Sequence, residues 1–296
     1  MQLDRTRIAI RQRSVLDSLD LSLRVIAAYA RPLAVCLLLG VIPLWLVNHF
    51  AIAWMVADRD DPSDFPTRFI YHLVLLTYIQ APLATLFATL YLGQAVFLER
   101  PSIRTVVVNV LKMSGRVLVV QILARGVGVV FFLVLTIRRG SNFDNFGEGV
   151  ALVGLALYTT IFRAAWPFIN EIVLLERNPI TSNSRKVMTV HRRSRMLHGA
   201  GANEVLNRWI VGLIVGVLLG AAFCGSFLFV SGVFFHDWRL SPFLLQYCAP
   251  LSLWAVAGFM AVFRFLSYLD LRIRQEGWEV ELRLRAEAAR LKRKLA

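Results

Sequence analysis

Charged residues are scarce in this chain of 296 residues: they make up 18% of it, whereas apolar residues make up 57%. A soluble domain of this length rarely has so few charges. Cysteines are scarce too, and Cys36, Cys224 and Cys248 all lie in or beside long apolar runs. They lack metal-ligand spacing and have no partner outside those runs, so we interpret them as small apolar packing residues.

Catalytic and cofactor motifs are also missing. The sequence has no Gly-rich phosphate loop, no nucleophile elbow, and no Ser or Cys with a local nucleophile signature. His49, His72 and His236 could lie near one another on one side of a membrane, but no two of them have the i,i+4 spacing of a helical metal site. We interpret them as interfacial histidines, and we expect a non-enzymatic protein with no cofactor, no metal and no catalytic residues.

Six long apolar runs dominate the rest of the sequence. About 20 helical residues cross a hydrocarbon core of roughly 30 Å, and each run is long enough to do so. The sequence therefore predicts an all-α, polytopic bundle of six transmembrane helices. The runs are 33–56, 69–98, 117–137, 150–175, 209–235 and 245–268.

The segments between the runs alternate in Lys and Arg content. The segments on one side hold 25 of these residues and those on the other side hold 5, and the remaining three lie within runs. Because basic loops stay in the cytoplasm, this layout predicts a multi-pass protein of the cytoplasmic (inner) cell membrane with both termini inside. It also explains the net charge of +14 without nucleic acid. The basic segments are 1–31, 99–116, 176–208 and 270–296.

We divide the chain into a cytoplasmic N-terminal segment 1–31, a membrane domain 32–268 and a cytoplasmic tail 269–296. Short amphipathic helices are predicted before the odd-numbered spans, over 15–30, 103–115 and 184–197. Ser14 and Asp17 have the spacing of a capping box at the start of the first. Such helices would lie in the interface and direct Arg side chains to anionic phospholipid headgroups.

Two span ends look alike and lie 77 residues apart: Leu98-Glu99-Arg100-Pro101 and Leu175-Glu176-Arg177-Asn178-Pro179. A weaker copy, Tyr268-Leu269-Asp270-Leu271-Arg272, closes the sixth run. The pattern predicts three tandem helical hairpins. A glutamate is unfavourable at the negative end of a helix dipole, so we expect each Glu of the motif to have a cationic partner, such as one on a neighbouring repeat.

These closures, together with the tail Tyr-Leu-Asp-Leu-Arg-Ile-Arg-Gln-Glu-Gly-Trp at 268–278, resemble uncharacterised bacterial six-span integral membrane proteins. Those proteins are similar to the membrane domain attached to some glycerophosphodiester phosphodiesterases. The resemblance implies a bacterial cytoplasmic membrane. It carries no activity to any residue of this chain, because the catalytic phosphodiesterase domain has no counterpart in it.

Four ionisable side chains fall inside the predicted spans: Arg125, Arg163, Glu171 and Arg264. Each costs about 2.5–3.5 kcal/mol to insert, so each needs a partner or water. We predict that Glu171 pairs with Arg125 or with Arg264. The cluster is interpreted either as a structural ion pair with an inward-reaching Arg, or as an anion or lipid-phosphate site.

Small residues and prolines mark the remaining features of the spans. Gly212, Gly216 and Gly220 form a small-xxx-small stripe, which predicts close helix packing within the chain or a homo-oligomer seam. Prolines occur within four of the spans, as they do at the sites of some transporters but also in ordinary membrane helices. We expect a scaffold or accessory subunit whose basic side contacts anionic lipids and a membrane-protein partner. The alternative is a transporter or lipid-handling protein that uses the Arg/Glu cluster. The prolines are Pro43, Pro82, Pro167 and Pro250.

Overall fold

The computed structural model describes residues 12–57, 65–97, 101–119, 128, 134, 145–182, 187–199 and 202–277. All regular structure in these residues is helical, which confirms the predicted all-α class. Five helical segments are long and apolar enough to cross a membrane, so the protein has the helices of a multi-pass membrane protein. The predicted span 117–137 lies mostly outside the described residues. The five segments are Ala30–Ile52, Thr67–Val96, Gly147–Ala165, Ala202–Phe235 and Leu244–Gln275.

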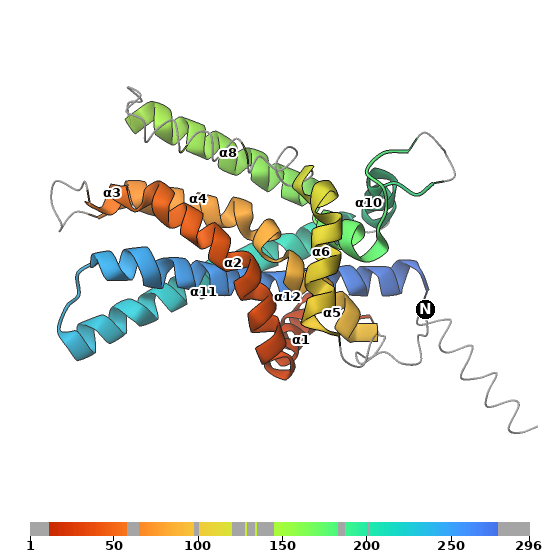
Figure 1. Cartoon of the computed structure of the whole chain (residues 1–296), viewed down its shortest axis with the longest axis horizontal. Coiled ribbons are helices and arrows are strands. Elements are labelled where there is room, and N and C mark those ends of the chain that lie inside the picture. Colours follow the sequence, from red (N-terminus) through yellow and green to blue (C-terminus); the bar gives the residue numbers. More distant parts are fainter. Residues whose placement is uncertain are drawn as a thin grey trace, which may run out of the picture.

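The long helices run along the longest axis of the molecule (Figure 1). Helix α8 (Asn145–Ala165) lies on one side, and α11 (Ala202–Phe235) packs beside α12 (Ala249–Gln275). Helix α12 also contacts α4 (Thr67–Ala84) and α5 (Leu86–Phe97), and α2 (Ala30–Ile52) packs against both of these. Helix α12 is therefore the central element, which explains why many of its residues are buried.

Short helices form where amphipathic helices were predicted. Helix α1 (Val15–Ala28) begins with a capping box in which the Asp17 amide donates to Ser14 Oγ. Helix α6 (Ile103–Leu118) runs across the long axis in Figure 1, and α10 (Val190–Gly199) lies near the end of α12. The third helix was predicted over 184–197 but begins at Val190: residues 187–189 are not helical, and 184–186 lie outside the described residues.

Proline breaks the second and fourth spans. Helix α4 ends at Ala84 and α5 begins at Leu86, two to four residues after Pro82. Helix α8 ends at Ala165, before Pro167, and the chain continues as α9 (Ile169–Glu171) and the π-helical turn η3 (Ile172–Glu176). The apolar span predicted over 150–175 is therefore not one unbroken helix, because the nitrogen of Pro167 has no hydrogen to donate, and its part Gly147–Ala165 is long and apolar enough to cross a membrane.

The break in α4 is tightly packed against α2. A Cβ atom added to Gly40 of α2 would lie 1.9 Å from the carbonyl oxygen of Ala84. Only glycine allows two backbones to approach this closely. Gly40 therefore fixes where α2 crosses the end of α4.

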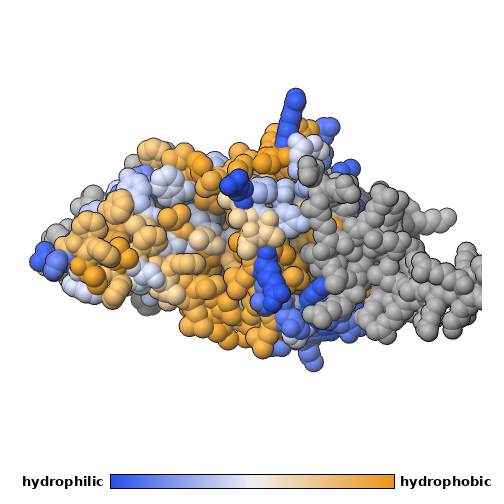
Figure 2. Space-filling view, turned by 90° about the horizontal axis from the view of Figure 1, so that it is seen from below, coloured by the Kyte–Doolittle hydropathy of each residue, from blue (hydrophilic) through white to orange (hydrophobic). Residues whose placement is uncertain are grey.

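The buried apolar residues form two clusters along the bundle. One joins α1, α2, α5, α6, η3, α10 and α12, and the other joins α2, α4, α8, the short helix α3 (Trp54–Ala57) and the π-helical turn η4 (Leu244–Cys248). We call the end that carries α1, α10 and the last turns of α12 the basic end. On the face drawn in Figure 2, hydrophobic residues cover most of the middle, and hydrophilic residues gather toward the basic end.

Candidate functional site

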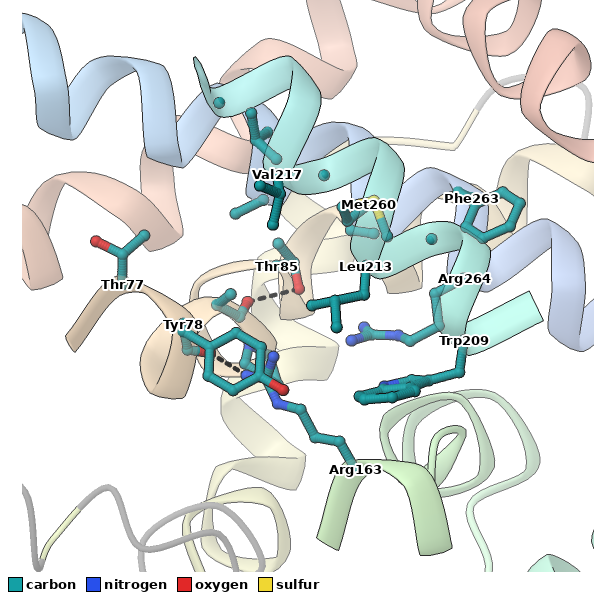
Figure 3. Close-up of a pocket in the computed structure, with 18 of the residues that line it drawn as sticks. Thr77, Tyr78, Thr85, Arg163, Trp209, Leu213, Val217, Met260, Phe263 and Arg264 are labelled. Carbon is teal, nitrogen blue, oxygen red and sulfur yellow. Dashed lines mark hydrogen bonds between the residues drawn. The ribbon is translucent and has the colours of Figure 1, made fainter. Parts of the chain in front are cut away.

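A cavity of about 520 Å³ lies among α4, α8, α11 and α12 (Figure 3). This volume is in the range of ordinary small-molecule sites. Its walls are mainly apolar, and it reaches the surface of the bundle beside α11, where Val217 is 64% exposed. The cavity therefore opens sideways, toward the surroundings of the apolar helices.

The predicted glycine stripe forms one wall of this cavity. Gly212, Gly216 and Gly220 line it from α11 and face side chains of α12, including Met260 and Leu253. The stripe therefore packs α11 against α12 within one chain, with side chains rather than a second backbone in the gap.

Arg163 reaches the cavity from α8 and binds the break in α4. Its Nη2 donates to the carbonyl oxygen of Tyr78, and its guanidinium lies 3.8 Å from the centroid of the Tyr78 ring. That carbonyl is four residues before Pro82 and so lacks its usual helical donor. Nearby, Asn170 Nδ2 donates to the Pro82 carbonyl at 2.7 Å. Pro82 thus frees the Tyr78 carbonyl, which Arg163 satisfies, and Asn170 satisfies the Pro82 carbonyl at the break between α4 and α5.

Arg264 enters the cavity from α12. Its Nε donates to Glu171 Oε1 at 2.7 Å, which is one of the two pairings that the sequence predicted. Arg264 Nη2 is buried and has no hydrogen-bond partner among the described residues. Figure 3 shows the side chains of Arg163 and Arg264 reaching into the same cavity, with the Arg163 guanidinium against the Tyr78 ring and Trp209 beside Arg264.

Positive charge is in excess at this point of the cavity. Glu171 pairs with Arg264, but no carboxylate in the described part of the chain forms an ion pair with Arg163. Like charges that line one cavity repel one another, so an uncompensated guanidinium beside a second one is unfavourable. The hydroxyls of Thr77 and Ser267, on two further residues of the wall, are buried and find no hydrogen-bond partner among the described residues, and the Thr77 hydroxyl points away from the two arginines in Figure 3. An anion bound beside Arg163 would balance the excess positive charge.

The basic end of the cavity is closed by ionic contacts. Arg208, which lines the cavity, pairs with Asp270 of α12 and donates to the Arg13 carbonyl at 2.9 Å. Asp270 also accepts from the Arg13 amide at 2.8 Å and pairs with Arg274 at 3.0 Å. These contacts hold the start of α1 across the junction of α11 and α12. A ligand would therefore enter the cavity beside α11 more easily than from the basic end.

A second ionic cluster surrounds Glu176, the acid of the repeated motif. Glu176 accepts from Arg193 of α10 at 2.7 Å and from the Tyr268 hydroxyl at 2.6 Å, and Arg272 lies 3.7 Å away. The cationic partner expected for this acid is therefore present. Both Tyr268 and Arg272 belong to the third copy of the motif.

Arg193 also pairs with Glu276, just beyond α12, and the pKa values of both groups are shifted by their ionic partners. Burial disfavours the charged form of each group, but the hydrogen bonds to its ionic partners favour that form more strongly. The two glutamates Glu176 and Glu276 raise the pKa of the Arg193 guanidinium, and Arg272 and Arg193 lower the pKa of the Glu276 carboxyl.

The remaining predicted residues are placed as follows. Arg125, Glu99 and Arg100 lie outside the described residues, and Arg177 ends η3 in the left-handed conformation. The described residues contain no cluster of three His, Cys, Asp or Glu that could hold a metal.

Sequence reasoning missed the Arg208–Asp270 pair, although each residue lies at the end of an apolar run. It also missed the pairing of His72 with Glu148.

Comparison with protein families, with curated proteins and with solved structures found no match.

Proposed function

We propose that this protein binds an anionic amphiphile, such as an acidic phospholipid or a fatty acid, in the cavity between α4 and α11. It would act as a lipid-handling protein of a bacterial cytoplasmic membrane, with the basic end and both termini in the cytoplasm. The observation that carries the proposal is the uncompensated guanidinium charge in a mainly apolar cavity that opens sideways. The resemblance to the six-span bacterial proteins agrees with this location.

The dimensions suit a headgroup oxygen at the arginines and an acyl chain along α11. From Arg264 to Leu253, both in the cavity wall, α12 advances roughly 16 Å at about 1.5 Å per residue. The wall over this length is built from glycines and apolar side chains, including Met260 and Val256. A small soluble anion would leave this apolar length unfilled, whereas an amphiphile would cover it.

The test is mass spectrometry of the lipids that remain bound after purification in a mild detergent. Wild type is expected to retain an anionic amphiphile in about equimolar amount, and Arg163→Gln is expected to lose it. Arg239→Gln is the matched control, because it removes an exposed positive charge that lies away from the cavity. Equal retention by all three proteins would contradict the proposal. Stabilisation by inorganic phosphate alone would indicate a soluble anion instead.

A scaffold or accessory subunit is the second candidate. The ionic clusters of the basic end support it, because they fix α1, α10, α11 and α12 in one arrangement that a partner could recognise. A stoichiometric membrane-protein partner that Arg163→Gln retains, with no bound amphiphile in wild type, would favour this candidate.

A further inference from the structure

We infer that His72 and Glu148 form a buried site that binds one exchangeable proton, near the end of the bundle opposite the basic end. This site is separate from the arginine-lined cavity and does not depend on the function proposed for it. His72 comes from α4 and Glu148 from the first turn of α8. His72 is 1% exposed and Glu148 is 3% exposed, so water does not solvate either group.

Hydrogen bonding fixes one nitrogen of the His72 ring. Nδ1 lies 2.8 Å from the carbonyl oxygen of Arg68. A carbonyl oxygen only accepts hydrogen bonds, so Nδ1 must carry a hydrogen whether the ring is neutral or charged. Only Nε2 is left to gain or lose a proton.

Nε2 faces the Glu148 carboxylate. It lies 3.2 Å from Oε1, within ion-pair range, but the two atoms are not aligned as a hydrogen bond, and Nε2 has no hydrogen-bond partner among the described residues. With a neutral ring, a nitrogen lone pair would face a carboxylate oxygen, and both groups would be acceptors. A proton on either atom turns this repulsion into attraction. The geometry of the pair therefore favours one proton between His72 Nε2 and Glu148 Oε1.

Arg68 keeps that proton exchangeable rather than permanent. It donates to both oxygens of Glu148, at 3.1 and 2.8 Å, and so already balances the carboxylate charge. A charged imidazole would then leave one excess positive charge in a buried site, which opposes protonation. The repulsion between acceptors and the cost of the buried charge act in opposite directions. Their balance lets the site respond to pH.

No other described charged group contacts the pair. The neighbouring helix α3 has no ionisable side chain, and its residue Trp54 lies under the Arg68 guanidinium. On α2, the His49 ring packs at a tilt against the rings of Trp45 and Tyr247. Between Leu244 and Phe263, η4 and α12 carry only Tyr247 and Cys248 as ionisable groups. Within the described part of the chain, the response to pH therefore belongs to Arg68, His72 and Glu148.

The test is nitrogen NMR of protein labelled with ¹⁵N-histidine in lipid nanodiscs, titrated from about pH 5 to 8, the range in which histidines titrate. The signals of His72 are identified by their loss in His72→Gln. We expect Nδ1 to stay protonated throughout, and Nε2 to be protonated at the acid end and to lose the proton as pH rises. A His72 signal that does not change over this range would overturn the inference.

Glu148→Gln tests the role of the carboxylate. This variant is expected to lose the protonated Nε2 signal at the acid end, while the signals of His49, which has no carboxylate partner among the described residues, stay unchanged. A His72 titration that is the same in Glu148→Gln as in wild type would overturn the shared site. If the variant does not fold, the wild-type titration alone tests whether His72 exchanges a proton, because it needs no substitution at Glu148.

Discussion

The ion pair between Glu171 and Arg264 gives the sharpest test of how charge is held inside this bundle. Glu171 is 0% exposed, and Arg264 Nε lies 2.7 Å from its Oε1. Glu171→Gln keeps the shape and one acceptor oxygen but removes the negative charge. Breaking a buried pair costs about 3–5 kcal/mol, because the other charge stays buried without compensation. The Arg264 side chain is 22% exposed, so we expect the lower limit, about 3 kcal/mol.

The assay is a double-mutant cycle of unfolding free energies, measured in one detergent. Glu171→Gln, Arg264→Gln and the double variant are compared with wild type. Because each single variant leaves the other partner unpaired, the double variant should be more stable than the sum of the two losses predicts, by about 2 kcal/mol. A loss below about 0.5 kcal/mol for Glu171→Gln, with additive effects, would refute the reasoning. Each charge would then be stabilised by groups other than the opposite member of the pair.

Three further predictions follow from the packing, the ionic clusters and the charge layout. Gly40→Ala should cost about 1–3 kcal/mol or more of unfolding free energy, because its Cβ would meet the Ala84 carbonyl, whereas Gly154→Ala, where the added Cβ meets nothing within 4 Å, should not. The lowered pKa of Glu276 means that its contribution to stability is present above its ordinary value of 4.5 and is lost as pH falls through the lowered value. Glu276→Gln should therefore have a lower unfolding free energy than wild type at neutral pH, and the difference between the two proteins should become smaller as the pH is lowered. A difference in unfolding free energy that is independent of pH would contradict this. Single cysteines in the predicted external loops should react with an impermeant thiol reagent added to cells, whereas Ser184→Cys should not, and labelling of Ser184→Cys from outside would overturn the topology. The external positions are Ser63→Cys, Ser141→Cys and Ser241→Cys.

The sequence predicted the helical class and the positions of most long helices, because apolar runs of spanning length are a strong signal. It also predicted α1 from Ser14 and Asp17, since a capping box is a local pattern. The break after Ala165 was missed, although Pro167 was recognised. Proline is common in membrane helices, and whether it kinks or ends one depends on the tertiary contacts around it.

The candidate site could be predicted only in part. Glu171 and Arg264 were recognised because buried charges need partners, and a short set of partners was available. The contact of Arg163 with the Tyr78 carbonyl was not predicted, because it depends on how α8 lies against α4. The cavity itself leaves no sequence signal, since its walls are ordinary apolar residues of α11 and α12. The pairing of His72 with Glu148, 76 positions apart, likewise depends on tertiary packing.

Photocrosslinking with an anionic lipid would test the central claim most directly. The lipid would carry a photoreactive group in its acyl chain, and a zwitterionic lipid with the same chain would serve as the comparison. If the cavity binds an anionic amphiphile, the anionic lipid should label the cavity wall, near Leu213, Val217 and Met260, more strongly than the exposed apolar residues of α8. Arg163→Gln should remove this preference. Equal labelling of the cavity wall and of α8 by both lipids would contradict the account.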